Sequence, residues 1–351
     1  MPTNFFFSLL IAFALSFIAT PLVRNFLVKR SLVEDPIKKQ KKDKNSTATT
    51  AVPRGGGVPI FLGIVVSVLM FLPLDRQLAS ILIAMTLTLG VGIFDDLFDI
   101  SPKLRLVTNI TAAIIVVASG IGIAYISNPF GGVFDLSFIR FEFDWFGPHS
   151  IWLISDLLAI FWIVWCMNIT GWSGGVEGQL PGFVGISALF IGLLGLKFSQ
   201  DIQQWPVIIL AGAVAGAYFG FLPFNFYPQT IMPGYSAKSL AGFSLGVLSI
   251  LSGAKLATLF LLLAIPMLDA IFVIGRRYFQ GRSLVKPDGQ HLHHLLLRLG
   301  WSRQKIAILY WLVSLCLGLA TLLLNTQQKL YVFIALIVTF TFSLIKIYRH
   351  I

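Results

Sequence analysis

The sequence predicts an all-α polytopic membrane protein, a helical bundle with about eleven transmembrane helices. Of its 351 residues, 56% are hydrophobic and 12% are charged, and the mean hydropathy is +0.85. An ordinary soluble chain carries about 25% charged residues. Here, apolar runs long enough to cross a hydrocarbon core of about 30 Å recur from end to end. Each run is uniformly apolar, which favours helices over the alternating strands of a membrane barrel.

The predicted spans follow the apolar runs between charges and Pro/Gly clusters. They cover residues 4–23, 56–74, 77–94, 106–126, 150–169, 183–199, 206–224, 240–254, 257–275, 306–324 and 330–348. No basic segment precedes the first run and no small-residue cleavage site follows it, so we expect a retained helix. Residues 1–351 are expected to form a single integral membrane domain.

The distribution of Lys and Arg predicts the orientation. Alternate gaps between the spans hold 21 of these residues on one side and five on the other. This asymmetry places the N-terminus outside and the C-terminus in the cytoplasm. The basic loop 24–55 and the histidine loop 276–305 are then cytoplasmic. The aromatic loop 127–149 is external; its alternation suits a short hairpin or an interfacial segment, and we favour an aromatic lid.

The net charge of +11 does not indicate nucleic acid, because the basic residues lie between apolar runs and form no separate polar domain. Anionic membrane lipids or an anionic substrate fit better. The two cysteines, Cys166 and Cys316, lie inside apolar runs and predict neither a disulfide framework nor a zinc site.

An acidic cluster, Asp95, Asp96 and Asp99, lies at the inner end of the third predicted span. This spacing places at least two carboxylates on one helical face, where repulsion favours a bound cation. Magnesium suits the cluster, since it accepts one or two carboxylates and completes its shell with waters and substrate phosphates. The alternative is an unliganded acidic helix end, although acids at a helix C-terminus oppose the macrodipole.

Arg54, Gly55 and Gly56 open the second predicted span. Glycines at a helix N-terminus can leave backbone N–H groups free for phosphate oxygens, and Arg54 adds positive charge. Taken alone, the pattern is also ordinary loop-to-helix punctuation.

A glycine-rich loop from Asn168 to Gly182 follows the fifth span, and Glu177 is the only acid in it. Its glycines permit the backbone to approach a ligand closely, but a flexible turn would look the same. Further on, Asn225 and Phe226 precede Lys238. An aromatic ring beside an amide suits stacking and hydrogen bonding of a nucleobase, and an interfacial aromatic belt is the alternative.

Three of the five histidines, His291, His293 and His294, lie in the last cytoplasmic loop. On a helix, His291 and His294 share a face with Arg298 and aim donors at one anion or carboxylate. Zinc ligation ranks second because no third ligand is evident. A solvated histidine-rich loop is the simplest alternative.

In combination and in this order, these motifs resemble those of the polyprenyl-phosphate N-acetylhexosamine-1-phosphate transferases. This superfamily, glycosyltransferase family 4, includes phospho-N-acetylmuramoyl-pentapeptide transferase and the undecaprenyl-phosphate GlcNAc-1-phosphate transferases. The resemblance covers the whole chain. It implies UDP-N-acetylhexosamine and polyprenyl (undecaprenyl) phosphate as substrates, UMP as a product, and Mg²⁺ or Mn²⁺ as the cofactor. It also implies a bacterial-type cytoplasmic (inner) membrane location and a role in cell-envelope polysaccharide or peptidoglycan precursor synthesis.

The expected site combines these motifs. The resemblance implies catalytic roles for Asp95, Asp96 and Asp99. We expect substrate binding by Arg54, Gly55, Gly56, Asn168, Asn225, Phe226, Lys238, His291, His293, His294 and Arg298. We expect Asp95, Asp96 and Glu177 as the metal ligands.

The chain departs from the family pattern at four positions. Gly171 replaces an Asn, Gly174 and Glu177 replace Asp residues, and Tyr235 replaces the Asp that is the family's main magnesium ligand. A neutral phenol, with a pKa of about 10, is a poor substitute for that carboxylate. Either Glu177 reaches a shifted ion beside the acidic cluster, or Lys238 supplies positive charge in place of some metal function.

Two other functions remain open at this point. These departures also suit a catalytically impaired homologue that binds lipid phosphate or a nucleotide sugar. A transporter is suggested by Asp156 and Asp269, which lie within apolar spans, although Arg276 and Arg277 could pair with Asp269. The sequence does not decide whether the chain forms a homodimer.

Overall fold

The computed structural model describes residues 2–34, 51–144, 148–197, 200, 204–253, 256–281 and 289–350. Its helices are α1 (Pro2–Lys29), α3 (Gly57–Phe71), α4 (Arg76–Phe98), α5 (Pro102–Val117), α6 (Leu153–Ser173), α7 (Gln179–Leu196), α8 (Trp205–Asn225), α9 (Gly234–Leu251), α10 (Leu256–Leu262), α11 (Ala264–Phe279), α12 (Leu292–Arg298), α13 (Arg303–Leu323) and α14 (Thr326–His350). Its strands are β1 (Val33–Glu34), β2 (Val52–Pro53), β3 (Tyr125–Ser127), β4 (Val133–Asp135), β5 (Arg140–Asp144) and β6 (Pro148–Trp152).

The chain is an all-α polytopic membrane protein. Within the described residues, seven helices are long and apolar enough to cross a membrane: α1, α4, α6, α7, α8, α13 and α14. Each of the eleven predicted ranges overlaps a helix, but the range 106–126 extends past the end of α5 into β3. However, α3, α5 and α9 do not meet the same length and hydropathy limits, and the range 257–275 is not one helix. It is divided at Leu263 into α10 and α11, which are bent by 88° and make an eighth span if taken together.

The centre of the bundle is α8, which packs against α1, α3 and α7. Small residues make the close approach to α1 possible: a Cβ added at Gly216 would lie 2.0 Å from the Leu9 carbonyl oxygen, and one at Gly220 would lie 2.4 Å from that of Phe13. Glycines one turn apart are typical of such tight contacts between membrane helices. The second main contact joins α9 to α4 and α6, and it positions the polar site described below.

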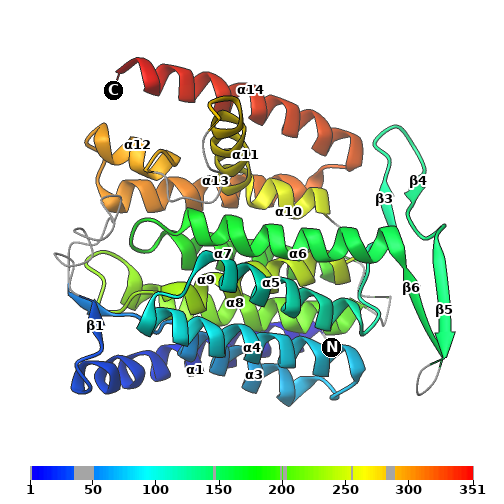
Figure 1. Cartoon of the computed structure of the whole chain (residues 1–351), viewed down its shortest axis with the longest axis horizontal. Helices are drawn as coiled ribbons and strands as arrows, with labels where there is room; N and C mark the ends of the chain where they lie inside the picture. The colour runs from blue at the N-terminus through cyan, green and yellow to red at the C-terminus, as the bar shows by residue number, and fades with distance from the viewer. Residues whose placement is uncertain are drawn as a thin grey trace.

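The two ends of the bundle differ in structure (Figure 1). The strands β3 to β6 lie at one end, and β1 and α12 lie at the other. The predicted external loop 127–149, for which we favoured an aromatic lid, contains regular strands. It holds two antiparallel hairpins, β3–β4 and β5–β6, as the alternation of residues allowed. Residues 145–147, between β5 and β6, are outside the described residues.

The predicted cytoplasmic loops are partly structured. In the loop 24–55, α1 continues to Lys29, and β1 pairs with β2; residues 35–50 are outside the described part. In the loop 276–305, α11 continues to Phe279 and α12 forms a further short helix; residues 282–288 are outside the described part.

Candidate functional site

Asp96 connects the end of α4 to the start of α9. Its Oδ1 accepts a hydrogen bond from the backbone N–H of Tyr235 at 2.6 Å, and its Oδ2 accepts one from the Ser236 hydroxyl at 2.6 Å. Gly234 has a φ of +67°, and a Cβ there would lie 2.3 Å from Asp96 Oδ2. An acid at the C-terminus of α4 opposes that helix dipole, but at the N-terminus of α9 it is favourable. The carboxylate therefore stabilises the junction of the two helices.

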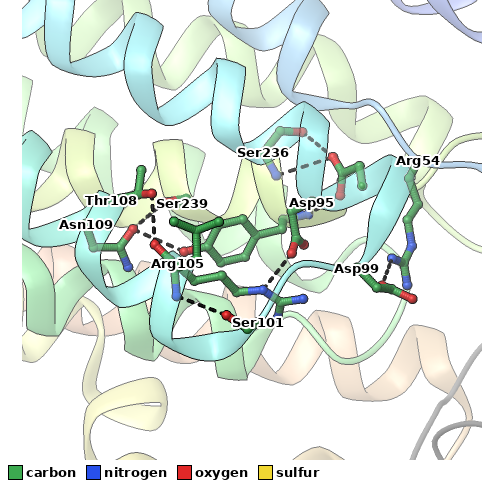
Figure 2. Close-up of polar contacts among 12 residues, drawn as sticks. Arg54, Asp95, Asp99, Ser101, Arg105, Thr108, Asn109, Ser236 and Ser239 are labelled. Atoms are coloured by element: carbon green, nitrogen blue, oxygen red, sulfur yellow. Dashed lines mark hydrogen bonds and ion pairs between the residues drawn. The ribbon is translucent and has the colours of Figure 1, made fainter.

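The other two acids of the cluster pair with arginines (Figure 2). Asp95 is 1% exposed, and its Oδ1 accepts a hydrogen bond from Arg105 Nε at 2.7 Å. Asp99 follows α4 with a φ of 51°, and its Oδ1 accepts one from Arg54 Nη1 at 3.1 Å. Arg54 also pairs with Glu34. Each of the three acids therefore has a different partner, in contrast to a cluster that shares one bound cation.

The N–H groups of Gly55 and Gly56 are not free, contrary to the prediction for this segment. Both donate to the Met232 carbonyl, at 3.4 and 3.1 Å. Close packing explains the second glycine, because a Cβ on Gly56 would lie 2.5 Å from the Phe221 ring. The part of this segment that can still meet an anion is the Arg54 side chain.

Tyr235 and Lys238 lie on successive turns of α9. The Tyr235 hydroxyl donates to Asn109 Oδ1 at 3.1 Å, and the Arg105 guanidinium carbon lies 5.0 Å from the Tyr235 ring centroid. The phenol is therefore directed to α5. Lys238 precedes the apolar part of α9 and is partly exposed, and its Nζ makes no hydrogen bond or ion pair with any described residue. Burial lowers the pKa of Lys238 to about 8, and the charge of Arg54 acts in the same direction.

The glycine-rich loop after α6 packs on Lys238 and on the histidine segment. A Cβ on Gly174 would lie 2.9 Å from Lys238 Cε and 3.5 Å from its Nζ. A Cβ on Gly175 would lie 2.0 Å from His293 Nε2, whereas a Cβ on Gly171 would meet nothing within 4 Å. Close approach thus accounts for two of these glycines, and open space surrounds the third.

The rings of His291, His293 and His294 lie beside one another. His294 lies four residues before Arg298 on α12, as predicted, but His291 does not belong to that helix. The ring centroids of His291 and His293 lie 6.0 Å apart with planes at 4°, and those of His293 and His294 lie 4.2 Å apart. His291 precedes α12 in extended conformation, which breaks the helical spacing assumed for it. Arg298 is exposed and donates to the Gly289 carbonyl.

Asp269 of α11 positions the histidine segment. Its Oδ2 lies 2.8 Å from His291 Nδ1, and its Oδ1 accepts a hydrogen bond from the backbone N–H of Leu292 at 2.9 Å. His293 is 2% exposed, and its Nδ1 has no hydrogen-bond partner among the described residues. Burial, followed by the charge of the neighbouring His294, holds the pKa of His293 well below its usual range, so this ring is neutral at pH 7.

Three other predicted substrate residues have partners within the protein. Asn225 is 1% exposed; its Oδ1 accepts a hydrogen bond from Gly178 N–H at 3.0 Å, and its Nδ2 donates to two groups of the loop after α8. The Phe226 ring lies 5.4 Å from Trp311. Asn168 donates to a carbonyl one turn earlier in α6, at 2.8 Å. The contacts of Asn225 and Phe226 hold loops in place, and substrate binding by all three residues stays a prediction.

Among the described residues, the side chains do not assemble a site for a divalent metal. Glu177 is 4% exposed and accepts two hydrogen bonds from Arg303 Nη1, at 3.0 and 2.8 Å. No contact brings it together with Asp95 or Asp96, each of which has its own partners. Within the part of the chain that the structure describes, no group of three or more His, Cys, Asp or Glu side chains could hold a metal ion. The predicted ligand set is thus not assembled, and Mg²⁺ or Mn²⁺ stays an expectation from the resemblance.

Sequence reasoning missed three residues of this site. Arg105 and Asn109 lie one turn apart on α5, and their only sequence signal is that Arg105 follows Asp95 by ten residues. The third, Asp269, was considered only as an acid within an apolar span that nearby arginines or solvent could neutralise. In the structure it contacts His291 and the N-terminus of α12.

The comparison with known protein families decides the assignment. The model of glycosyl transferase family 4 matches residues 78–253, half of the 351-residue chain. The chain belongs to glycosyl transferase family 4. The matched segment contains the acidic cluster, the glycine-rich loop and the start of α9, so this family member carries most of its candidate site inside the region that defines the family.

Relatives extend the similarity beyond that segment. A probable undecaprenyl-phosphate N-acetylglucosaminyl 1-phosphate transferase of Bacillus subtilis is 27% identical over 316 residues, covering 88% of this chain and 82% of the relative. A decaprenyl-phosphate N-acetylglucosaminephosphotransferase of Mycobacterium tuberculosis is 28% identical, covering 86% of this chain and 78% of the relative. A phospho-N-acetylmuramoyl-pentapeptide-transferase of Leuconostoc mesenteroides is 26% identical, covering 92% of this chain and 99% of the relative.

Proposed function

We propose that this family 4 member transfers an N-acetylhexosamine-1-phosphate from a UDP-sugar to a polyprenyl phosphate and releases UMP. The names of its relatives, which include undecaprenyl- and decaprenyl-phosphate N-acetylglucosamine phosphotransferases, support this reaction. The observation that carries the proposal is the convergence at the start of α9. There, the acidic end of α4, the glycine-rich loop and the histidine segment meet around positive side chains that a diphosphate could contact.

In this proposal the acids mainly position other groups. Asp95 holds Arg105, Asp99 holds Arg54, and Asp96 holds the first N–H groups of α9. A phosphate monoester has a second pKa of about 6, so the acceptor phosphate is largely ionised at pH 7 without a general base. The arginines and the N-terminus of α9 favour the negative charge of both substrates.

The reaction takes place at the cytoplasmic face of a bacterial-type inner membrane in this proposal. Eleven crossings, with α10 and α11 as one broken crossing, put the N-terminus outside and the C-terminus inside. Two facts support this orientation: the Lys and Arg asymmetry, and the position of the C-terminus at the end of the bundle that holds β1 and α12, opposite the hairpins (Figure 1). The candidate site then faces the compartment that holds UDP-sugars.

The direct test is UMP release. The purified full-length chain is incubated in detergent with UDP-GlcNAc or UDP-GalNAc and undecaprenyl phosphate, with Mg²⁺, with Mn²⁺ and without either. Lipid-dependent release of UMP is the expected result. Release that does not depend on the lipid, or no release across a panel of UDP-sugars, would overturn the proposal.

A catalytically impaired homologue is the second candidate, and Gly174 and Tyr235 favour it because neither can supply the family's carboxylate. It predicts binding of UDP-sugar or lipid phosphate without turnover, which the same assay separates from the first. The transporter hypothesis has lost its main support. Asp156 accepts a hydrogen bond from the backbone N–H of Trp152 at 3.0 Å, and Asp269 pairs with His291.

A further inference from the structure

Lys238 is an unpaired cation at the centre of the candidate site. Lys238 is only partly exposed to solvent, and its Nζ has no hydrogen-bond or ion-pair partner among the described residues. A partly buried ammonium group is costly unless something compensates its charge. Asp96 contributes favourable charge, but that carboxylate already accepts hydrogen bonds from Tyr235 and Ser236. The unmade hydrogen bonds of Lys238 therefore point to an anionic ligand.

The side chain of Lys238 lies where a side chain at residue 174 would have to go. A Cβ on Gly174 would meet Lys238 Cε at 2.9 Å, which is closer than Cβ atoms ordinarily approach. A side chain at 174 would therefore require the end of the Lys238 side chain to move.

A second cation lies beside the first. The Arg105 side chain is one-third exposed, and its Nε is held by Asp95 at 2.7 Å. The guanidinium lies over the Tyr235 ring, so the residue that replaces an acid supports an arginine. The charge of Arg105 is close enough to Lys238 to lower the pKa of that lysine. Arginine in such a fork geometry suits phosphate oxygens.

We propose that Lys238, together with Arg105, supplies the positive charge on the nucleotide-sugar diphosphate in place of a divalent cation, so that the transfer does not require added metal. This inference rests on the proposed function. In the step itself, an oxygen of the acceptor phosphate forms a bond to the β-phosphorus of the UDP-sugar. The bond from that phosphorus to the bridging oxygen breaks, and UMP leaves with this oxygen. The dianionic acceptor phosphate and the dianionic UDP-sugar give a dianionic lipid diphosphate sugar and a dianionic UMP. The charges balance, so no proton is needed.

The experiment compares UMP release with Mg²⁺ and in excess EDTA, after the full-length protein has been dialysed against EDTA and its metal content measured by plasma mass spectrometry. The expected rates agree within about twofold. Release that EDTA abolishes and Mg²⁺ restores would overturn this inference and leave the proposed function intact. No release under either condition would overturn both.

Variants give a second readout, the affinity for UDP in EDTA measured by calorimetry. Lys238→Met keeps the aliphatic stem and removes the charge, so UDP binding should weaken about 10-fold to 100-fold, the effect of losing a charge-assisted hydrogen bond. Lys238→Arg should retain most of the affinity. Lys329→Met is the matched control, since Lys329 is also partly exposed but bonds Thr258 between α10 and α14. Unchanged UDP affinity in Lys238→Met, with a normal size-exclusion profile, would contradict the inference.

Discussion

The buried pair of Glu177 and Arg303 allows a direct test of whether Glu177 has a structural role or is a metal ligand. Removing one member of a buried ion pair costs about 3–5 kcal/mol, because the other charge is left without a partner. The Glu177 side chain is 3% exposed and that of Arg303 is 17% exposed. Arg303→Met leaves Glu177, the more deeply buried of the two charges, without a partner, so we expect a loss of about 3 kcal/mol in the free energy of unfolding. Glu177→Gln leaves an arginine that can reach water, so its loss should be smaller, about 1–2 kcal/mol.

The assay is thermal unfolding in detergent of the two single variants, the double variant and a control. In soluble domains of 150–250 residues, 1 kcal/mol shifts the Tm by about 2–4 °C, so Arg303→Met should lower it by several degrees. The double variant should recover at least half of that loss, because no buried charge remains. Lys305→Met, an exposed neighbour in the same helix, should stay within about 0.5 kcal/mol of the parent. Additive losses in the double variant would refute the ion-pair explanation and reopen a ligand role for Glu177.

Three further predictions concern the candidate site. Gly175→Ala should displace His293 and lower kcat/KM at least tenfold. Gly171 has open space around it, so Gly171→Ala should leave the steady-state rates unchanged. Equal effects of the two substitutions would contradict the packing argument. Asp96→Ala leaves two donors of α9 unsatisfied and should lower the free energy of unfolding by about 2–4 kcal/mol. Asp96→Asn keeps one acceptor, so its loss should be smaller. Thermal unfolding measures both losses, and equal losses would count against a role of Asp96 in joining α4 to α9. Lys238 is charged below its pKa of about 8 and neutral above it. In the parent protein, kcat/KM for the UDP-sugar should therefore fall as the pH rises through 8. A profile that stays flat through this range would contradict the role of Lys238 in binding the diphosphate.

Much of the fold could be predicted because membrane helices must be long and apolar. Each predicted apolar range overlaps a helix, although the range 106–126 extends beyond α5. The break at Leu263 was not predicted, although Pro266 cannot donate a hydrogen bond to the Leu262 carbonyl and so disfavours a continuous helix across residue 263. The outer hairpins were predicted only as an alternative, because short alternation among many aromatic residues does not separate a strand from an interfacial segment.

The candidate site was predicted at the level of motifs but not of contacts. The acidic cluster, the glycine-rich loop and the histidine segment do converge around α9. Their individual roles differ, because spacing along one helix does not show which neighbouring helix a side chain faces. Asp95 and Asp96 are adjacent in sequence, yet one pairs with Arg105 and the other with the N-terminus of α9. Likewise, Gly56 resembles a phosphate-binding residue in sequence, but it is explained by the Phe221 ring packed against it.

The most direct test of the central claim, that this site transfers a phospho-sugar to lipid, follows one phosphorus atom. UDP-GlcNAc labelled with ³²P at the β-phosphate is incubated with the purified protein and undecaprenyl phosphate, and the products are partitioned between butanol and water. The account predicts that the label moves into the butanol-soluble lipid while unlabelled UMP forms in equal amount. Label that remains in the aqueous phase, as UDP-sugar or as free sugar phosphate, would contradict it.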